Sequence, residues 1–439
     1  MAGSSDADGG GPTTRRKSAG GSQRRRTAWL GVAAGEFYTT LLSALLFCVL
    51  LASYYLLRPL RDELAVHGGT GQLAWTFTAT FAVMLLAVPL FGWLLSRFPL
   101  ARVLPGIYLF FAASLLAFAA SLALPGTSAL AGPAFFVWVS VYNLCVVSVF
   151  WSLMADLHAP QAAARLFGLI AAGGSIGAVT GPLLAIALIE HQGRGVLLPA
   201  AAALLTVAAI LLVALRHHGD PQGARKPLGG HPLQGVQAVL RQPYLLGICG
   251  WLLLYSGTST LLYFSQTEIV GQAIADRSAR TQLFAAMDLT VNTLSLLGQV
   301  LLTGRVLSRF GSGSGLGVLP VVSIIGFALL TLSPTLAVIV GVQVMRRATN
   351  FAFARPARET LFTVVGRDER FKAKNLIDTV VYRGGDALSG WLHSALQALG
   401  LAVAGIAGLA LPLAAAWLAL SAALGRGHRR RSRQSENTS

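Results

Sequence analysis

Long apolar blocks alternate with short polar segments along almost the whole chain. Each block has about 20 residues, the length that an α-helix needs to cross a hydrocarbon core of roughly 30 Å. A transmembrane β-barrel would instead show short segments of alternating hydrophobicity. The pattern therefore predicts an all-α integral membrane protein with about twelve transmembrane helices. The expected spans are 36–57, 72–96, 102–124, 133–155, 166–189, 195–215, 243–264, 282–303, 314–333, 335–354, 376–396 and 399–423.

The longest polar segment between two spans divides the expected helices into two groups of six. We expect a disordered basic cytoplasmic tail, an N-terminal six-helix bundle, a central cytoplasmic loop, a C-terminal six-helix bundle and a second basic cytoplasmic tail. Their bounds are 1–35, 36–215, 216–242, 243–424 and 425–439.

Composition agrees with a membrane protein, because 54% of the residues are hydrophobic and only 12% are charged. The net charge of +17 would suggest nucleic acid as the partner of a soluble protein. Here, however, the basic residues flank the spans, and no basic stretch is interleaved with stacking aromatic residues. We therefore expect a monomer in a lipid bilayer, with no nucleic-acid partner.

The distribution of basic residues also predicts the orientation. With both termini in the cytoplasm, only five of the 34 Lys and Arg fall in loops on the opposite side. Cytoplasmic loops of membrane proteins carry such an excess of positive charge. The expected location is the inner (cytoplasmic) membrane of a bacterium.

The two halves share short motifs in the same order. G-x-x-L-S-R-F occurs at 92–98 and again at 304–310, and the paired glycines of 167–177 correspond to those of 382–390. The offsets, about 205–212 residues, indicate two homologous six-helix halves, with chance alignment of apolar residues as the alternative. Gly173, Gly177 and Gly181 also form a small-xxx-small face, which allows close approach of two helices.

The stretch SYYLLRPLRDELAV (53–66) places Arg58, Arg61, Asp62 and Glu63 directly after the first apolar block. Pro59 and these charges are expected to end the first span. The corresponding segment of the second half, 256–270, keeps an acid at Glu268 but has Gln266 where the first half has Arg61.

A helix terminator does not require such a difference between the repeats. Arg61 is therefore the first candidate substrate-binding residue, with Arg58 and Glu268 as further candidates. Asp62 is a candidate coupling or ion-pair residue.

The tenth span carries two consecutive arginines, Arg346 and Arg347, near its middle. A charge at the centre of a membrane helix costs about 2.5 to 3.5 kcal/mol on insertion scales, so it requires a reason. We expect Arg346 and Asn350, which share a helix face, to line a water-filled cavity and bind anionic cargo. In the alternative interpretation, both arginines pair with acids on neighbouring helices.

Acidic residues of the later spans are candidates for coupling or ion pairing. Asp288 is the single carboxylate on a polar face of span eight, and it is either a proton site or a salt-bridge partner. In span eleven, Arg383 is close enough in sequence to neutralise Asp378 or Asp386. An ion-pair network and a binding role are equally open there.

The chain lacks the motifs of common enzyme classes and of metal sites. It has no Walker A sequence, no H-E-x-x-H and no G-x-S-x-G, and its three cysteines are far apart in sequence. We therefore expect no enzyme, no cofactor and no metal.

Two six-helix halves with a basic central loop resemble the major facilitator superfamily, and the G-x-x-L-S-R-F loops look like a degenerate form of its loop 2–3 motif. Within it, Y-x-L-R-P-L-R-D-E-L (55–64) and the stretch 354–391 resemble the bacterial relatives of the non-mitochondrial ATP/ADP translocase family. That resemblance implies nucleotide binding and exchange, with roles for Arg61, Glu268 and Arg346.

The expected function is secondary active transport by alternating access. An organic or phosphorylated anion, such as a nucleotide in ATP:ADP exchange, is the first hypothesis for the cargo. The second is proton-coupled export of a small metabolite or drug, with Asp288 or Glu268 as the proton site. The third is a membrane scaffold or sensor that transports nothing.

Overall fold

The computed structural model of the chain describes residues 36–97, 100–124, 128–158, 160–216, 239–365, 373–374 and 376–436. Within these ranges the secondary structure is helical, without strands, and the predicted all-α fold class is confirmed. The predicted N-terminal tail and most of the predicted central loop, 217–238, lie outside the described residues.

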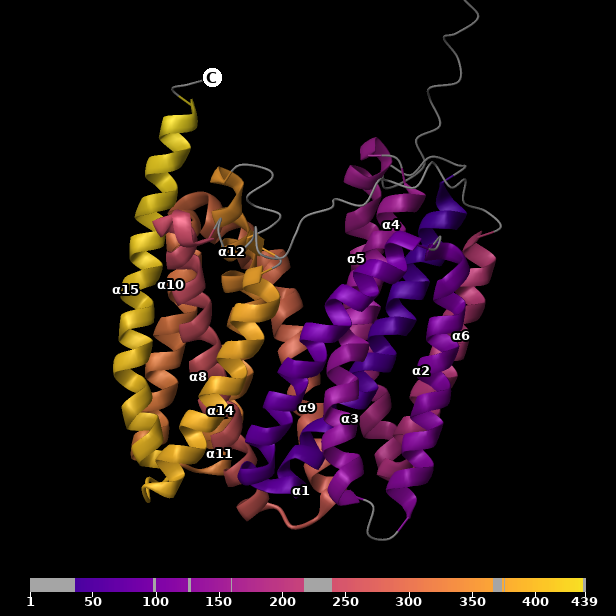
Figure 1. The fold of residues 1–439 in the computed structure, drawn as a ribbon, viewed down its shortest axis with the longest axis horizontal. Coiled ribbons are helices and arrows are strands. Elements are labelled where there is room, and N and C mark those ends of the chain that lie inside the picture. The colour runs from indigo at the N-terminus through magenta and orange to yellow at the C-terminus, as the bar shows by residue number, and fades with distance from the viewer. Residues whose placement is uncertain are drawn as a thin grey trace, which may run out of the picture.

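The helices form two groups that lie side by side (Figure 1). The first half contains α1 (Phe37–Arg97), α2 (Leu100–Ala123), α3 (Ser128–Leu144), η2 (Cys145–Val149), α4 (Phe150–Leu157), α5 (Pro160–Gln192), η3 (Arg194–Val196) and α6 (Leu197–Arg216). The second half contains α8 (Pro243–Ala273), α9 (Arg277–Gly298), η4 (Gln299–Thr303), α10 (Gly304–Leu332), α11 (Leu336–Thr349), η5 (Asn350–Ala354), α12 (Arg355–Leu361), η6 (Phe362–Val364), η7 (Ile377–Val381), α14 (Tyr382–Ala398) and α15 (Val403–Glu436).

The first span does not end at Pro59, so that expectation is wrong. Helix α1 continues through Pro59 and the charged cluster and bends only at Gly69, whose φ of 73° suits a residue without a side chain. The charges do not end the helix because they are buried against protein: Asp62 and Glu63 are 4% and 0% exposed. Helix α1 therefore contains both the first and the second span.

Nine segments of the described residues are long and apolar enough to cross a membrane, and the first of these, Phe37–Phe91, holds two spans. The segments α11–η5–α12 and η7–α14 supply the remaining two, so twelve spans result. These two segments carry the charged residues predicted for spans ten and eleven. Helix α15 continues to Glu436, so the basic residues from 425 onward are helical.

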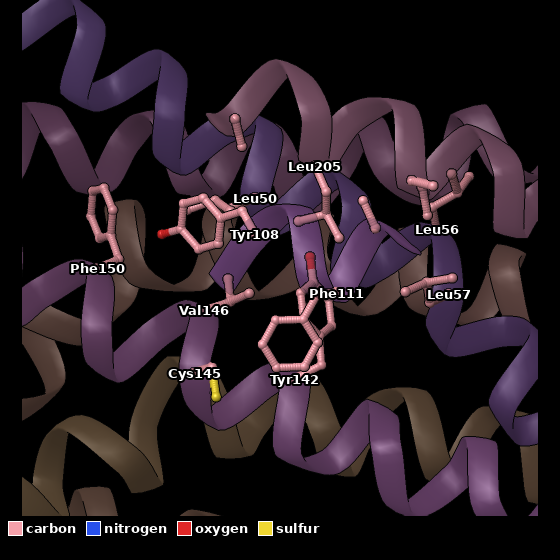
Figure 2. Packing of buried hydrophobic residues seen from close by; sticks show 14 of the residues in the cluster. Leu50, Leu56, Leu57, Tyr108, Phe111, Tyr142, Cys145, Val146, Phe150 and Leu205 are labelled. Atoms are coloured by element: carbon pink, nitrogen blue, oxygen red, sulfur yellow. The ribbon is translucent and has the colours of Figure 1, made fainter. Parts of the chain in front are cut away.

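Each half has its own hydrophobic core. In the first half, Leu50, Tyr108, Phe111, Tyr142 and Val146 belong to one buried cluster, and Figure 2 shows their side chains packed between the helices. Two further buried clusters lie among the helices of the second half. Two smaller buried clusters contain residues of both halves and lie where the halves meet.

The small-xxx-small face predicted for the fifth span brings α5 very close to α1. A Cβ at Gly177 would lie 2.1 Å from the carbonyl oxygen of Cys48, and one at Gly173 would lie 2.2 Å from that of Ala44. Only glycine fits at such a distance, so the predicted close approach is confirmed.

The halves meet toward the end of the molecule at which α8 connects to α9, which we call the α8–α9 end. In Figure 1, α1 of the first half lies beside α9 of the second half there. Asn292 of α9 donates to the carbonyl of Ala178 in α5 at 2.5 Å, and Trp391 of α14 donates to Thr78 of α1 at 2.9 Å. The opposite end, which carries α12, is called the α12 end.

Candidate functional site: a cavity between the halves

A cavity of about 740 Å³ lies between the two halves. Its walls come from α1, α3, η2 and α4 of the first half and from α8, α11, η5, α12, η7 and α14 of the second. Seven arginines and three aspartates line it: Arg58, Arg61, Arg346, Arg347, Arg355, Arg358, Arg383, Asp62, Asp378 and Asp386. The lining therefore carries a clear excess of positive charge.

Arg61 lies close to its neighbour in sequence, Asp62. Its Nη2 and Nε lie 2.6 Å and 3.0 Å from Oδ1 of Asp62, and the hydroxyl of Tyr263 in α8 donates to the same oxygen at 2.9 Å. The guanidinium also lies 5.0 Å from the ring centroid of Phe136. Arg61 thus faces the cavity with its charge largely balanced by Asp62.

Arg346 has a different environment and is 3% exposed. It donates to Ser323 from Nε at 3.0 Å, to Ser259 from Nη1 at 2.6 Å, and to Thr258 and the Tyr255 carbonyl from Nη2 at 2.8 Å and 3.2 Å. No carboxylate pairs with Arg346 in the described part of the chain. Of its five N–H groups, one on Nη1 remains for another partner.

Arg347 and Arg58 share one carboxylate. Arg347 donates from Nη2 to Oδ1 of Asp288, and Nη1 of Arg58 lies 3.4 Å from the same oxygen. Arg58 belongs to the first half, whereas Asp288 and Arg347 belong to the second, so this ion pair joins the halves.

The predicted neighbours in span eleven separate into two pairs. Asp386 lies 3.5 Å from Arg383 and accepts from Ser256 at 2.5 Å and from Thr260 at 3.3 Å. Asp378 instead lies 3.3 Å from Arg358 of α12. The first pair lies deep in the cavity wall and is mostly buried, and the second lies toward the α12 end.

The two remaining candidates differ in position. Asn350 begins the π-helical turn η5 and lines the cavity. Glu268 is not among the lining residues, and it accepts from Gln397 of α14 at 2.6 Å. The structure therefore does not bring Glu268 together with the arginines.

The sequence analysis did not assign a partner to Glu63. This fully buried carboxylate lies 2.8 Å from Arg277 and 3.5 Å from Arg280 of α9, and 3.0 Å from Arg194 of η3. In the sequence, these three arginines belong to the five basic residues of the loops expected on the side opposite the termini. Because basic residues are rare in these loops, their presence could have suggested a common acidic partner such as Glu63.

Aromatic rings form much of the remaining wall. The lining includes Tyr54, Tyr55, Phe77, Phe136, Trp151, Trp251, Tyr255, Tyr263, Phe351 and Tyr382. The cavity thus combines guanidinium groups, which bind anions, with flat rings, on which a planar group can stack.

Comparison with protein families gives one match, to the model described as "Major Facilitator Superfamily", over residues 25–364. Comparison with curated proteins gives no match.

Among solved structures, the nucleoside transporter NupG matches with a TM-score of 0.61 and 17% identity, covering 89% of this chain and 98% of that one. A bacterial homologue of the human lysosomal transporter Spinster, inward-facing and unoccupied, gives a TM-score of 0.59 and 14% identity over 92% and 98% of the two chains. A bacterial homologue of the iron transporter ferroportin, also inward-facing, gives 0.59 and 15% over 88% and 100%.

Proposed function

The chain belongs to the major facilitator superfamily and is a multi-pass membrane transporter of the alternating-access type, and we propose that its cargo is an organic or phosphorylated anion, such as a nucleotide. Family membership confirms the resemblance found in the sequence at the level of the superfamily. The relationship to the nucleotide-exchange family within it stays a prediction.

The observation that carries this proposal is the positive charge of the cavity. Seven arginines face three aspartates in the lining, and Arg346 has no carboxylate partner in the described ranges. A buried charge without a counterion is costly in a membrane protein. An anion in the cavity supplies that counterion, and a cation would add to the repulsion.

The size and the aromatic lining of the cavity support a cargo as large as a nucleotide. About 740 Å³ lies within the range of roughly 300–1,000 Å³ that is usual for pockets of small organic ligands. Phosphate groups would lie near the arginines, and a base would stack on rings such as Tyr255 or Tyr382. Smaller organic acids satisfy the charge argument but leave the aromatic wall unused.

The distribution of basic residues supports an orientation with both termini in the cytoplasm of a bacterium and the protein in the inner membrane. In that orientation the α12 end faces the cytoplasm, and the contacts at the α8–α9 end close the outer side. We propose that the protein works in this orientation as a monomer.

Counterflow in proteoliposomes tests the proposal. Purified protein is reconstituted with unlabelled ATP inside, and uptake of labelled ATP, ADP, phosphate and dicarboxylates is measured with and without a pH gradient. We expect exchange of at least one anion and a loss of roughly 100-fold in Arg346→Gln, because the unpaired cation is removed.

Arg309→Gln is the matched control, because Arg309 belongs to the repeated loop motif and does not line the cavity. An Arg346→Gln variant with wild-type exchange would contradict the proposed role of Arg346. If none of the labelled anions is taken up, the proposal of an anionic cargo is contradicted.

Proton-coupled export is the second candidate, and Asp386 is the observation in its favour. This carboxylate is 7% exposed and is held by two hydroxyl groups and one arginine, so it could take up a proton without losing its partners. In the same assay, transport driven by the pH gradient alone and lost in Asp386→Asn would favour this candidate.

A further inference from the structure

Asp288 lies on α9 beside the cavity, and its side chain is 1% exposed. Its Oδ1 is shared by Arg347 of α11 and Arg58 of α1. Both arginines line the cavity, whereas Asp288 itself does not. The carboxylate therefore lies behind two cations that face the cargo space.

This cluster is incompletely bonded. Oδ2 of Asp288 and the Nε atoms of Arg58 and Arg347 are buried and make no hydrogen bond within the described residues. A permanent ion pair between arginine and a carboxylate is commonly bidentate and uses both oxygens. Here Oδ1 of Asp288 contacts both arginines, whereas Oδ2 contacts neither. With two cations and one carboxylate, the cluster keeps one excess positive charge.

We propose that Asp288 is a positioning residue that competes with the cargo: its carboxylate holds Arg58 and Arg347 while the cavity is empty and yields them to the anionic group of the cargo. The inference rests on the proposed function, because it requires an anionic cargo. The group that fits is a phosphate or carboxylate, which can accept from two guanidinium groups at once.

The positions of the three residues explain why such a competitor is needed. Two arginines that face each other in a low-dielectric site repel, so an empty site without Asp288 would be unfavourable. Because Arg58 belongs to the other half, the Arg58–Asp288 pair also joins the halves in the empty state. A bound anion replaces this link by a bridge between Arg58 and Arg347, which couples occupancy of the cavity to the contact between the halves.

Binding of labelled ATP and of inorganic phosphate to the purified full-length protein tests this inference, with exchange in proteoliposomes as a second readout. In Asp288→Asn, the affinity for at least one of the two anions is expected to rise about tenfold or more, because the competing carboxylate is gone. The turnover number is expected to fall, because release of the anion would leave Arg58 and Arg347 without the carboxylate that stabilises them in the empty site. A purely structural ion pair predicts weaker binding and lower thermal stability together.

Asp378→Asn is the control, because it removes one carboxylate charge from the wall of the cavity and breaks a pair with Arg358 instead of Arg58 and Arg347. If the loss of one negative charge acts only through the electrostatic potential of the cavity, anion binding becomes tighter by the same factor in both variants. Displacement at Arg58 and Arg347 predicts a clearly larger gain in Asp288→Asn.

The double variant Asp288→Asn/Arg347→Gln keeps the net charge of the cluster and so guards against misfolding of the single variant. Displacement predicts that it binds the anion at least as tightly as the wild type, because Arg58 has no competitor left. Weaker binding than the wild type would overturn the inference, as would an unchanged affinity in a folded Asp288→Asn.

The two proposals fail in different measurements. Exchange by the wild type alone decides the anion cargo. The comparison of Asp288→Asn with the wild type tests whether the Asp288 carboxylate competes with the cargo. A higher affinity of the variant supports this competition even where binding by the wild type is too weak to detect. If neither the wild type nor Asp288→Asn binds ATP or phosphate, the proposed competition is overturned.

Discussion

At the scale of single residues, the arginines of the cavity differ in how their charge is balanced. Arg61 has the carboxylate of Asp62 within 2.6 Å, whereas Arg346 has only hydroxyl groups, one carbonyl and the rings of Tyr255 and Trp417 around it. The sequence analysis ranked Arg61 first because the second half has no counterpart for it. The structure adds a reason to give Arg346 equal weight, since it is buried and no carboxylate pairs with it in the described residues.

The Arg61–Asp62 pair predicts the behaviour of two variants. Arg61→Gln leaves Asp62 as a buried carboxylate without its cation, so we expect a loss of about 3–5 kcal/mol of stability. The double variant Arg61→Gln/Asp62→Asn removes both charges and should recover most of that loss. Thermal unfolding of the purified proteins measures both effects.

Exchange by the double variant then separates two roles for Arg61. If Arg61 only balances Asp62, exchange recovers together with stability. If Arg61 binds cargo, exchange stays low in a protein that is stable again. A single variant as stable as the wild type would contradict the ion-pair argument.

At the scale of helices, the packing of α5 against α1 depends on residues without side chains. The glycines of α5 allow its backbone to touch the backbone of α1 over several turns. Helix α1 also carries Arg58, Arg61 and Asp62, so its position relative to α5 fixes part of the cavity wall. The π-helical turns η2 and η5 occur at corresponding places of the two halves, and both contribute to the lining. Such turns are frequent at functional sites.

The close approach predicts that Gly177→Ala is destabilising, by about 1–3 kcal/mol, because a Cβ would lie 2.1 Å from the Cys48 carbonyl oxygen. Gly168→Ala in the same helix is the control, since nothing lies within 4 Å of its added Cβ. Alanine there should be neutral or slightly stabilising. Melting temperatures in detergent that fall equally for both variants would contradict the packing argument.

At the scale of the whole molecule, the two halves are held together at the α8–α9 end. Glu63 of the first half lies against Arg277 and Arg280 of the second, and it also pairs with Arg194 of η3. Transport by alternating access requires this end to open while the α12 end closes. The Glu63 cluster therefore stabilises the observed state relative to the opposite one. The transporter fold also leaves a scaffold or sensor without an observation in its favour.

Glu63→Gln should shift the population toward states that are open at the α8–α9 end, because two ion pairs between the halves are lost. Spin labels on the two halves at that end would report longer distances. Glu36→Gln is the control, since Glu36 pairs with Arg165 within the first half. Equal distance distributions in Glu63→Gln and the wild type would contradict this role.

The sequence by itself determined the all-α membrane fold, the approximate number of spans and the presence of arginines within the expected spans. These are local properties: a span needs about 20 apolar residues in a row, and a charge within it is visible without knowledge of its neighbours. The resemblance to the superfamily also rests on local motifs and their order along the chain, and the family match over residues 25–364 confirms it.

Only the tertiary structure decided which charged and polar side chains meet. Arg58 with Asp288, Glu63 with Arg277, and Arg346 with Ser323 come from different helices, and no spacing in the sequence specifies these partners. For the same reason the charges after Pro59 were misread as the end of a helix. In water or lipid such charges would stop a span, but partners on α9 and η3 balance Glu63 and allow α1 to continue to Gly69.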